Sequence, residues 1–355
     1  MSDVVEARPG PGPAGTGPGG DDGPRRSMLR QLFLRPETGS LVGAVVIFVL
    51  FFVVAGPFRR VESFATITYE ASVLGIMAVA VALLMIGGEF DLSAGVAVTT
   101  SAITAAELSY QLTLNVWVGV IAALAVSLAI GWFNGYLVVR TGLPSFLVTL
   151  GTFLMLQGVN LAVTRQITGT VSTQRISDMD GFGSLEAIFA SEWDIGGVRF
   201  RTVILWWLLF VAVATWVLLR TRVGNWIFAV GGNEASARAV GVPVAKVKIG
   251  LYMAVGFAAW FVGMHLLFSL QTVQAGEGVG NEFQYIIAAV IGGCLLTGGY
   301  GSAIGAAIGA FIFGMTRQGI VYAGWNPDWY MTFLGAMLIL ATLTNLYVKK
   351  LAARR

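Results

Sequence analysis

The stretch Gly87-Gly88-Glu89-Phe90-Asp91-Leu92-Ser93-Ala94-Gly95 decides the fold, because it interrupts a long apolar region with two carboxylates and three glycines. A charged side chain deep in a bilayer costs roughly 2.5 to 3.5 kcal/mol on insertion scales, so it needs a compensating role. Glycines let the backbone leave helical geometry, which is tolerated at membrane depth only where protein or a water-filled cavity shields it. The stretch therefore predicts a polar helix junction at the edge of a membrane domain.

The composition around this junction is that of a membrane protein. Of 355 residues, 56% are hydrophobic and 12% charged, whereas soluble domains carry about 25% charged residues. The single Cys294 and the single His265 exclude a disulfide framework and a Cys/His metal site built by this chain alone. We expect an all-α polytopic membrane protein with no metal, no catalytic residue and no nucleic-acid partner.

Apolar runs of about twenty residues predict about ten transmembrane helices. Their ranges are 40–58, 66–87, 92–110, 116–138, 145–164, 202–219, 248–270, 283–298, 301–320 and 329–347. Ten spans place both termini on one side of the membrane, where the connecting segments hold fifteen basic residues against six on the other side. By the positive-inside rule, both termini are predicted to be cytoplasmic.

The chain divides into three parts around this membrane domain. Residues 1–39 are predicted to be a disordered cytoplasmic tail, since the Gly- and Pro-rich start cannot bury enough apolar surface. Residues 40–348 form the membrane domain, and 349–355 form a basic cytoplasmic tail. The hydrophilic stretch 165–201 would lie outside, and its five acids suit either a surface for a soluble partner or an ordinary solvated loop.

A second hydrophilic stretch, within 223–247, predicts a short cytoplasmic helix. Asn233 is a good N-cap, and Glu234 suits the positive end of the helix dipole. Gly241 can adopt the left-handed conformation that ends a helix, and Pro243 prevents its continuation. About two helical turns are not stable alone in water. The helix must therefore dock, either on its own bundle or in a groove of another protein.

Five blocks of the sequence, in order, resemble the permease subunits of ABC importers for simple sugars, the ribose, xylose and galactose type. This branch belongs to a family that also includes branched-chain amino acid permeases. The blocks are Gly87–Gly95, Gly131-Trp132-Phe133-Asn134-Gly135, Pro144–Thr152, Asn233–Ile249 and Gly292–Ser302. The resemblance runs from about Ser63 to Tyr347.

The resemblance implies a permease subunit in the plasma membrane of a prokaryote, which is not itself an enzyme. It implies a partner ATPase that binds ATP and Mg, an extracytoplasmic solute-binding protein, and a second copy of the chain or a paralogous permease. It assigns coupling to the ATPase to Asn233, Glu234, Ala237, Arg238, Gly241 and Val242. It assigns the helix junction to Gly87, Gly88, Asp91, Ser93 and Gly95, and the substrate path to Asn134, Phe153, Gln157, Asn160 and Gln284.

The chain departs from the family pattern at three places. Glu89 and Phe90 stand where the family usually has a single Ile, which adds a residue and a carboxylate. Gln157 replaces a common Arg, and Gln284 replaces a common acidic residue. The last two exchanges make the path less charged, which suits a neutral polyhydroxylated solute or a structural swap equally well.

Several of these residues have more than one interpretation. Asp91 and Ser93 either cap the helix that begins near Leu92 or contact the solute or a gate. Asn134, Gln157 and Asn160 either form interhelical hydrogen bonds or line the path, and Phe153 either packs or stacks on a sugar ring. Glu89 is expected in cytoplasmic water, with pairing to Arg140 or to a base of the coupling segment as the alternative.

The functional prediction is an ATP-driven importer permease for a simple sugar or polyol. Branched-chain amino acids and nucleosides are alternative solutes, because their importers have related permeases. An ion-coupled secondary transporter is a third alternative, although such proteins usually carry ionisable or unwound elements in both halves of a repeat. An intramembrane enzyme is disfavoured, because one His, one Cys and no paired acids leave no nucleophile and base.

Overall fold

The computed structural model describes residues 36–112 and 115–353. In chain order the elements are α2 (Pro36–Val54), η1 (Gly56–Arg59), α3 (Val61–Ile86), α4 (Ala94–Gln111), α5 (Val116–Thr141), α6 (Ser145–Thr168), α7 (Phe182–Phe189), β1 (Glu192–Ile195), β2 (Val198–Arg201), α8 (Val203–Arg220), α9 (Arg222–Gly232), α10 (Glu234–Ala239), α11 (Val244–Leu270), α12 (Asn281–Ile291), α13 (Ala303–Tyr322) and α14 (Trp329–Ala353). Most of the predicted N-terminal tail, residues 1–35, lies outside this range. At the other end, α14 continues into the predicted basic tail.

Seven helices in the described ranges are long and apolar enough to cross a membrane by themselves, namely α2, α3, α5, α6, α8, α11 and α13. α14 holds a shorter apolar stretch, Trp329–Thr344. α12 has only 11 residues and ends at Ile291 rather than at residue 298, because Gly292 leads into Gly293 at φ 93°. The chain is thus an all-α polytopic membrane protein, while the count of ten spans stays a prediction.

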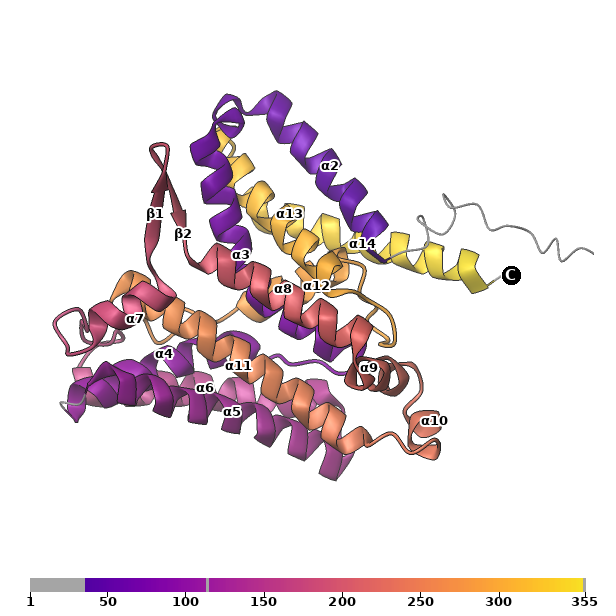
Figure 1. The fold of residues 1–355 in the computed structure, drawn as a ribbon, viewed down its shortest axis with the longest axis horizontal. Helices are drawn as coiled ribbons and strands as arrows, with labels where there is room; N and C mark the ends of the chain where they lie inside the picture. Colours follow the sequence, from indigo (N-terminus) through magenta and orange to yellow (C-terminus); the bar gives the residue numbers. More distant parts are fainter. Residues whose placement is uncertain (1–35, 113–114, 354–355) are drawn as a thin grey trace, which may run out of the picture.

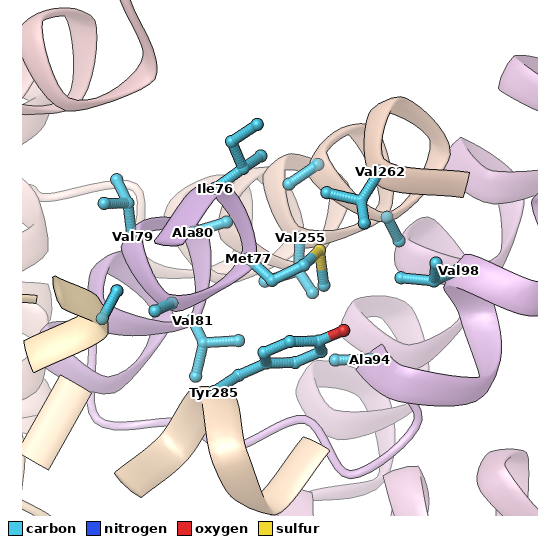
Figure 2. Close-up of a cluster of buried hydrophobic side chains, with 14 of the residues drawn as sticks. Ile76, Met77, Val79, Ala80, Val81, Ala94, Val98, Val255, Val262 and Tyr285 are labelled. Carbon is cyan, nitrogen blue, oxygen red and sulfur yellow. The ribbon is translucent and has the colours of Figure 1, made fainter. Parts of the chain in front are cut away.

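α3 is the central helix of the bundle (Figure 1). Its apolar window is 72% buried, against 22% for α6 and 33% for α5, so α3 faces protein and the other two face outward. Figure 2 shows the packing around it: Met77 and Val81 of α3 lie on the side of Tyr285 of α12, and Ala94 of α4 lies beside the Tyr285 ring. This core fixes α3 against the two helices that begin beside it.

The bundle has two ends, which we call the α10 end and the hairpin end. α8 runs between them, from the β1–β2 hairpin to α9 and α10 (Figure 1). The sequence did not predict the hairpin, in which Glu192 pairs with Arg201 across the two antiparallel strands. At this end the fully buried His265 of α11 contacts the Phe189 carbonyl oxygen at 2.7 Å and the Tyr69 hydroxyl at 3.3 Å.

Two helix starts meet inside the bundle. α3 ends at Ile86 near the α10 end, and residues 87–93 lead to the start of α4. α11 ends at Leu270 at the hairpin end, and residues 271–280 lead to the start of α12. Gly95 in the first turn of α4 lies against the Gly278 carbonyl oxygen and the Glu282 carboxylate, so a methyl group there would collide with both. The two connecting segments therefore approach one another from opposite ends.

Candidate functional site

Residues 87–93 are held as non-helical backbone by hydroxyl groups of α6. The N–H of Phe90 donates to Ser145 Oγ, and the N–H of Leu92 donates to Thr149 Oγ1, both at 3.1 Å. Backbone N–H groups that leave a helix inside a membrane need such partners, since each unsatisfied group costs several kcal/mol. We call these two bonds the hydroxyl clamp.

A chain of buried side-chain hydrogen bonds continues from the clamp into α5. Thr152 Oγ1 donates to Asn134 Oδ1 at 2.7 Å, and Asn134 Nδ2 donates to Ser93 Oγ at 2.9 Å. Ser93 Oγ donates in turn to Asp91 Oδ1 at 2.6 Å, and the Ser93 N–H reaches the same oxygen at 2.8 Å. All four residues are buried. We call this chain the Asn134 relay; it joins α6, α5 and the start of α4.

Glycines bring two further segments, the end of α9 and the stretch 298–299, against the end of α3. A methyl group at Gly231 would collide with the Ile86 carbonyl oxygen, and one at Gly298 would lie 2.7 Å from the Gly88 Cα. The same Ile86 oxygen accepts a hydrogen bond from the N–H of Gly299 at 2.8 Å. These glycines are therefore required by close backbone approach. All five sequence blocks meet in this region.

α10 stands at the edge of this region, and it has the predicted N-cap and the predicted left-handed glycine after its end. The Asn233 side chain accepts from the N–H of Ser236 at 2.9 Å, and Gly241 has φ 84° after the helix ends. Ala237 is buried against the bundle, so the helix docks on its own chain. Val240, the residue directly after α10, is 79% exposed, the highest value among the large apolar side chains described. α10 thus has one face on the bundle and an apolar tip in solvent.

Charged side chains connect α10 with the junction. Lys248 Nζ lies 2.7 Å from Glu234 Oε2 and 2.5 Å from Glu89 Oε1, and Arg238 lies 2.7 Å from the other oxygen of Glu234. The hydrogen bond from Lys248 is the main cause that lowers the pKa of Glu234 below its usual value. Glu234 is therefore a carboxylate at neutral pH.

Two expectations from the sequence differ from the structure. Glu89 does not sit in water: it is 7% exposed and paired with Lys248, because the chain turns back over the start of α11. Ser93 occupies the N-cap position of α4 but makes no capping hydrogen bond, because its φ −81° and ψ −7° are helical rather than extended. Its hydroxyl belongs to the Asn134 relay instead.

The five predicted path residues do not lie together. Asn134 is buried in the relay, and Asn160 is buried with its Nδ2 3.5 Å from the Val96 carbonyl oxygen. Phe153 and Gln157 are half-buried and share the face of α6 that carries Asn160, at the spacing i, i+4, i+7. Only Gln284 lines a polar cavity, which has a volume of about 90 Å³.

This polar cavity lies between α3, α12, α13 and α14. Besides Gln284 it is lined by Asn281, Tyr285, Tyr330 and the ion pair between Glu70 and Arg317, whose atoms lie 2.8 Å apart. Pairing occurs because Arg317 on α13 faces Glu70 on the adjacent α3. Amides, aromatic rings and a charge pair around one cavity suit a polar solute.

A larger groove of about 480 Å³ has the opposite character. It lies between α3, α8, α9 and α11, and Lys246 is the only charged residue that lines it. Its apolar walls offer no group that would bind hydroxyls, so it is a poor site for a sugar.

Sequence reasoning missed Ser145 and Thr149, although a signal was present. Together with Thr152 they follow the spacing i, i+4, i+7, which places three hydroxyls on one face of α6. It offered a base of the coupling segment as an alternative partner of Glu89 but did not single out Lys248, because 159 positions separate the two residues and no local pattern joins them.

Comparison with known proteins places these features in a family. The model of the branched-chain amino acid transport system permease component matches residues 63–342. The ribose import permease of Escherichia coli K12 is 32% identical over 310 residues, covering 87% of this chain and 93% of that protein. The fructose import permease of Rhizobium meliloti is 28% identical, with 92% and 91% covered. The galactose/methyl galactoside import permease of Escherichia coli K12 is 30% identical, with 89% and 95% covered.

No solved structure matches the chain. The family match, in contrast, extends over well more than half of the sequence and contains the junction, the hydroxyl clamp, the Asn134 relay and α10. The chain therefore belongs to this family of transport-system permease components, the membrane subunits of ABC importers.

Proposed function

We propose that the chain forms the translocation path of an ATP-driven ABC importer for a simple sugar or polyol. The observation that carries the proposal is the position of α10, which has an exposed apolar tip and an ion-paired connection to non-helical backbone inside the bundle. An element that is exposed to solvent on one side and contacts a helix junction on the other can transmit a movement from a partner protein to the translocation path.

The solute class follows from the relatives and from the polar cavity. The relatives described above are named for ribose, fructose and galactose import. The cavity beside Gln284 offers amide and phenol groups that can exchange hydrogen bonds with hydroxyls, and rings that can pack on a sugar. Branched-chain amino acids remain the alternative, because the family model carries that description.

The partners occupy the two ends of the bundle. The α10 end, with its exposed Val240, is the proposed docking site for an ATPase that binds ATP and Mg. The hairpin end, with exposed Asp178, Asp180 and Asp194, is the proposed surface for the solute-binding protein. The termini would then lie in the cytoplasm, and the outward faces of α5 and α6 would lie against lipid or a second copy.

The test is reconstitution of the chain with its ATPase and binding protein in liposomes. We expect ATP-dependent uptake of a labelled sugar from a panel of ribose, fructose, galactose, leucine and adenosine. Uptake of leucine or adenosine alone would overturn the solute class. Uptake that does not require ATP, and that stops when an ionophore collapses the ion gradients, would show a secondary transporter.

A substitution at the tip of α10 tests the docking site. Val240→Asp should abolish co-purification of the ATPase, because it places a charge in an apolar contact while leaving the exposed position free of internal strain. Val240→Ile is the matched control and should retain the ATPase. Full ATPase binding by Val240→Asp would exclude α10 as the docking element.

A further inference from the structure

Lys248 lies between two carboxylates that belong to different parts of the chain. Its Nζ is 2.5 Å from Glu89 in the junction and 2.7 Å from Glu234 in α10. The side chain of Lys248 is 12% exposed and that of Glu89 is 9% exposed, whereas Glu234 is 42% exposed. The pair on the junction side is therefore shielded from water and salt, which strengthens its attraction.

The helix that carries Lys248 also holds the junction through a second contact. One turn further along α11, the Tyr252 hydroxyl donates to the Phe90 carbonyl oxygen at 3.0 Å. The N–H of the same Phe90 is held by Ser145 in the hydroxyl clamp. α11 and α6 therefore fix the backbone of Phe90, the residue next to Glu89. A shift of Glu89 must then also move Phe90 and its two partners.

Beyond its chain connections and the packing of the buried Ala237, α10 is attached to the rest of the bundle through Glu234. It has only six residues, and its salt bridges within the described ranges are those of Glu234 with Lys248 and Arg238. Because Arg238 belongs to α10 itself, Lys248 is the ionic contact that leaves the helix. The ionic contacts between α10 and the junction therefore run from Glu234 through Lys248 to Glu89.

We propose that Lys248 and Glu89 form a coupling latch, in which Lys248 is a positioning residue that carries the movement of α10 to residues 87–93. Glu89 is the residue by which this chain departs from the family signature, so the latch is a feature of this chain rather than of the signature. The inference rests on the proposed function, since the latch transmits a movement of α10 that an ATPase partner would cause.

The experiment measures the solute transported per ATP hydrolysed in the reconstituted complex. Glu89→Gln keeps the size and the hydrogen-bond acceptor but removes the charge, and Lys248→Met keeps the length of the side chain. We expect each to lower the ratio by about fivefold or more, the lower range of allosteric coupling factors, while ATPase binding is retained. Lys246→Met, two positions away on the exposed face of α11, is the matched control and should keep the wild-type ratio.

The double variant Glu89→Gln/Lys248→Met tests whether the two residues act as a unit. It should transport no worse than the poorer single variant, because either change alone already opens the latch. Losses that multiply in the double variant would contradict the latch. Uptake and ATP hydrolysis that fall together, at a constant ratio of solute to ATP, would also contradict the latch, because that result indicates a purely structural ion pair.

The wild-type complex separates this inference from the proposed function. A wild-type complex that hydrolyses ATP without sugar uptake contradicts the proposed function before any variant is compared. A wild-type complex that transports, with Glu89→Gln at the same ratio, contradicts the latch alone.

Discussion

Asn134 uses both ends of its amide, and this explains why an Asn stands in a membrane helix. Its oxygen accepts from Thr152 and its nitrogen donates to Ser93, so the side chain joins two helices to the start of a third. The sequence allowed Asn134 either to form interhelical hydrogen bonds or to line the path. In the structure it forms interhelical hydrogen bonds. The sequence also could not show that its partners lie 41 positions before it and 18 positions after it.

Removal of this amide should destabilise the protein. Asn134→Ala removes two buried hydrogen bonds, one from Thr152 and one to Ser93, and their loss costs about 1–3 kcal/mol of unfolding free energy. The two hydroxyls keep their bonds to the Val148 carbonyl oxygen and to Asp91. The measurement is unfolding of the purified protein in detergent. Thr152→Val should show a smaller loss in the same direction, because Asn134 keeps its bond to Ser93 in that variant.

The exposed Thr141 supplies the control for that series. Its hydroxyl donates to the Leu137 carbonyl oxygen in the last turn of α5, outside the relay. Thr141→Val should therefore leave the unfolding transition nearly unchanged. Equal losses for Thr141→Val and Asn134→Ala would show that the relay contributes nothing specific.

At the scale of elements, the contact between α9 and the end of α3 depends on one glycine of a pair. Gly231 lies against the Ile86 carbonyl oxygen, whereas a methyl group at Gly232 meets nothing within 4 Å. The sequence showed two adjacent glycines and could not distinguish them, because the difference is in the neighbour and not in the local pattern.

This asymmetry predicts opposite results for two adjacent substitutions. Gly231→Ala should lower the unfolding free energy by about 1–3 kcal/mol, the usual cost of overpacking, because α9 must move away from α3. Gly232→Ala should be neutral or slightly stabilising, since alanine favours a helix over glycine. Thermal unfolding of both variants in detergent checks the pair. Identical behaviour of the two variants would contradict the close approach.

For the whole molecule, hydropathy predicted the all-α membrane fold, and glycine patterns located the junction and α10. The long-range contacts that build the site could not be predicted from the sequence. Lys248 reaches Glu89 and Arg317 reaches Glu70 across helices that are distant in the chain. The end of α12 was misplaced because Gly292 and Gly293 lie inside an apolar run, where hydropathy gives no boundary.

The proposed orientation can be checked through the lone cysteine. Cys294 is buried, so the unmodified protein should not react with a membrane-impermeant maleimide. Gly196→Cys, in the turn of the hairpin, should be labelled in intact cells, and Val240→Cys only after permeabilisation, because α8 carries the chain across between them. Labelling of both variants from the same side would overturn the orientation.

The hydroxyl clamp has a consequence for how this family can change its sequence. It holds the main-chain N–H groups of Phe90 and Leu92 and places no demand on the side chains of those positions. Positions 90 and 92 could therefore exchange side chains without loss of either bond of the clamp, whereas Glu89 beside them is held through its own side chain by Lys248.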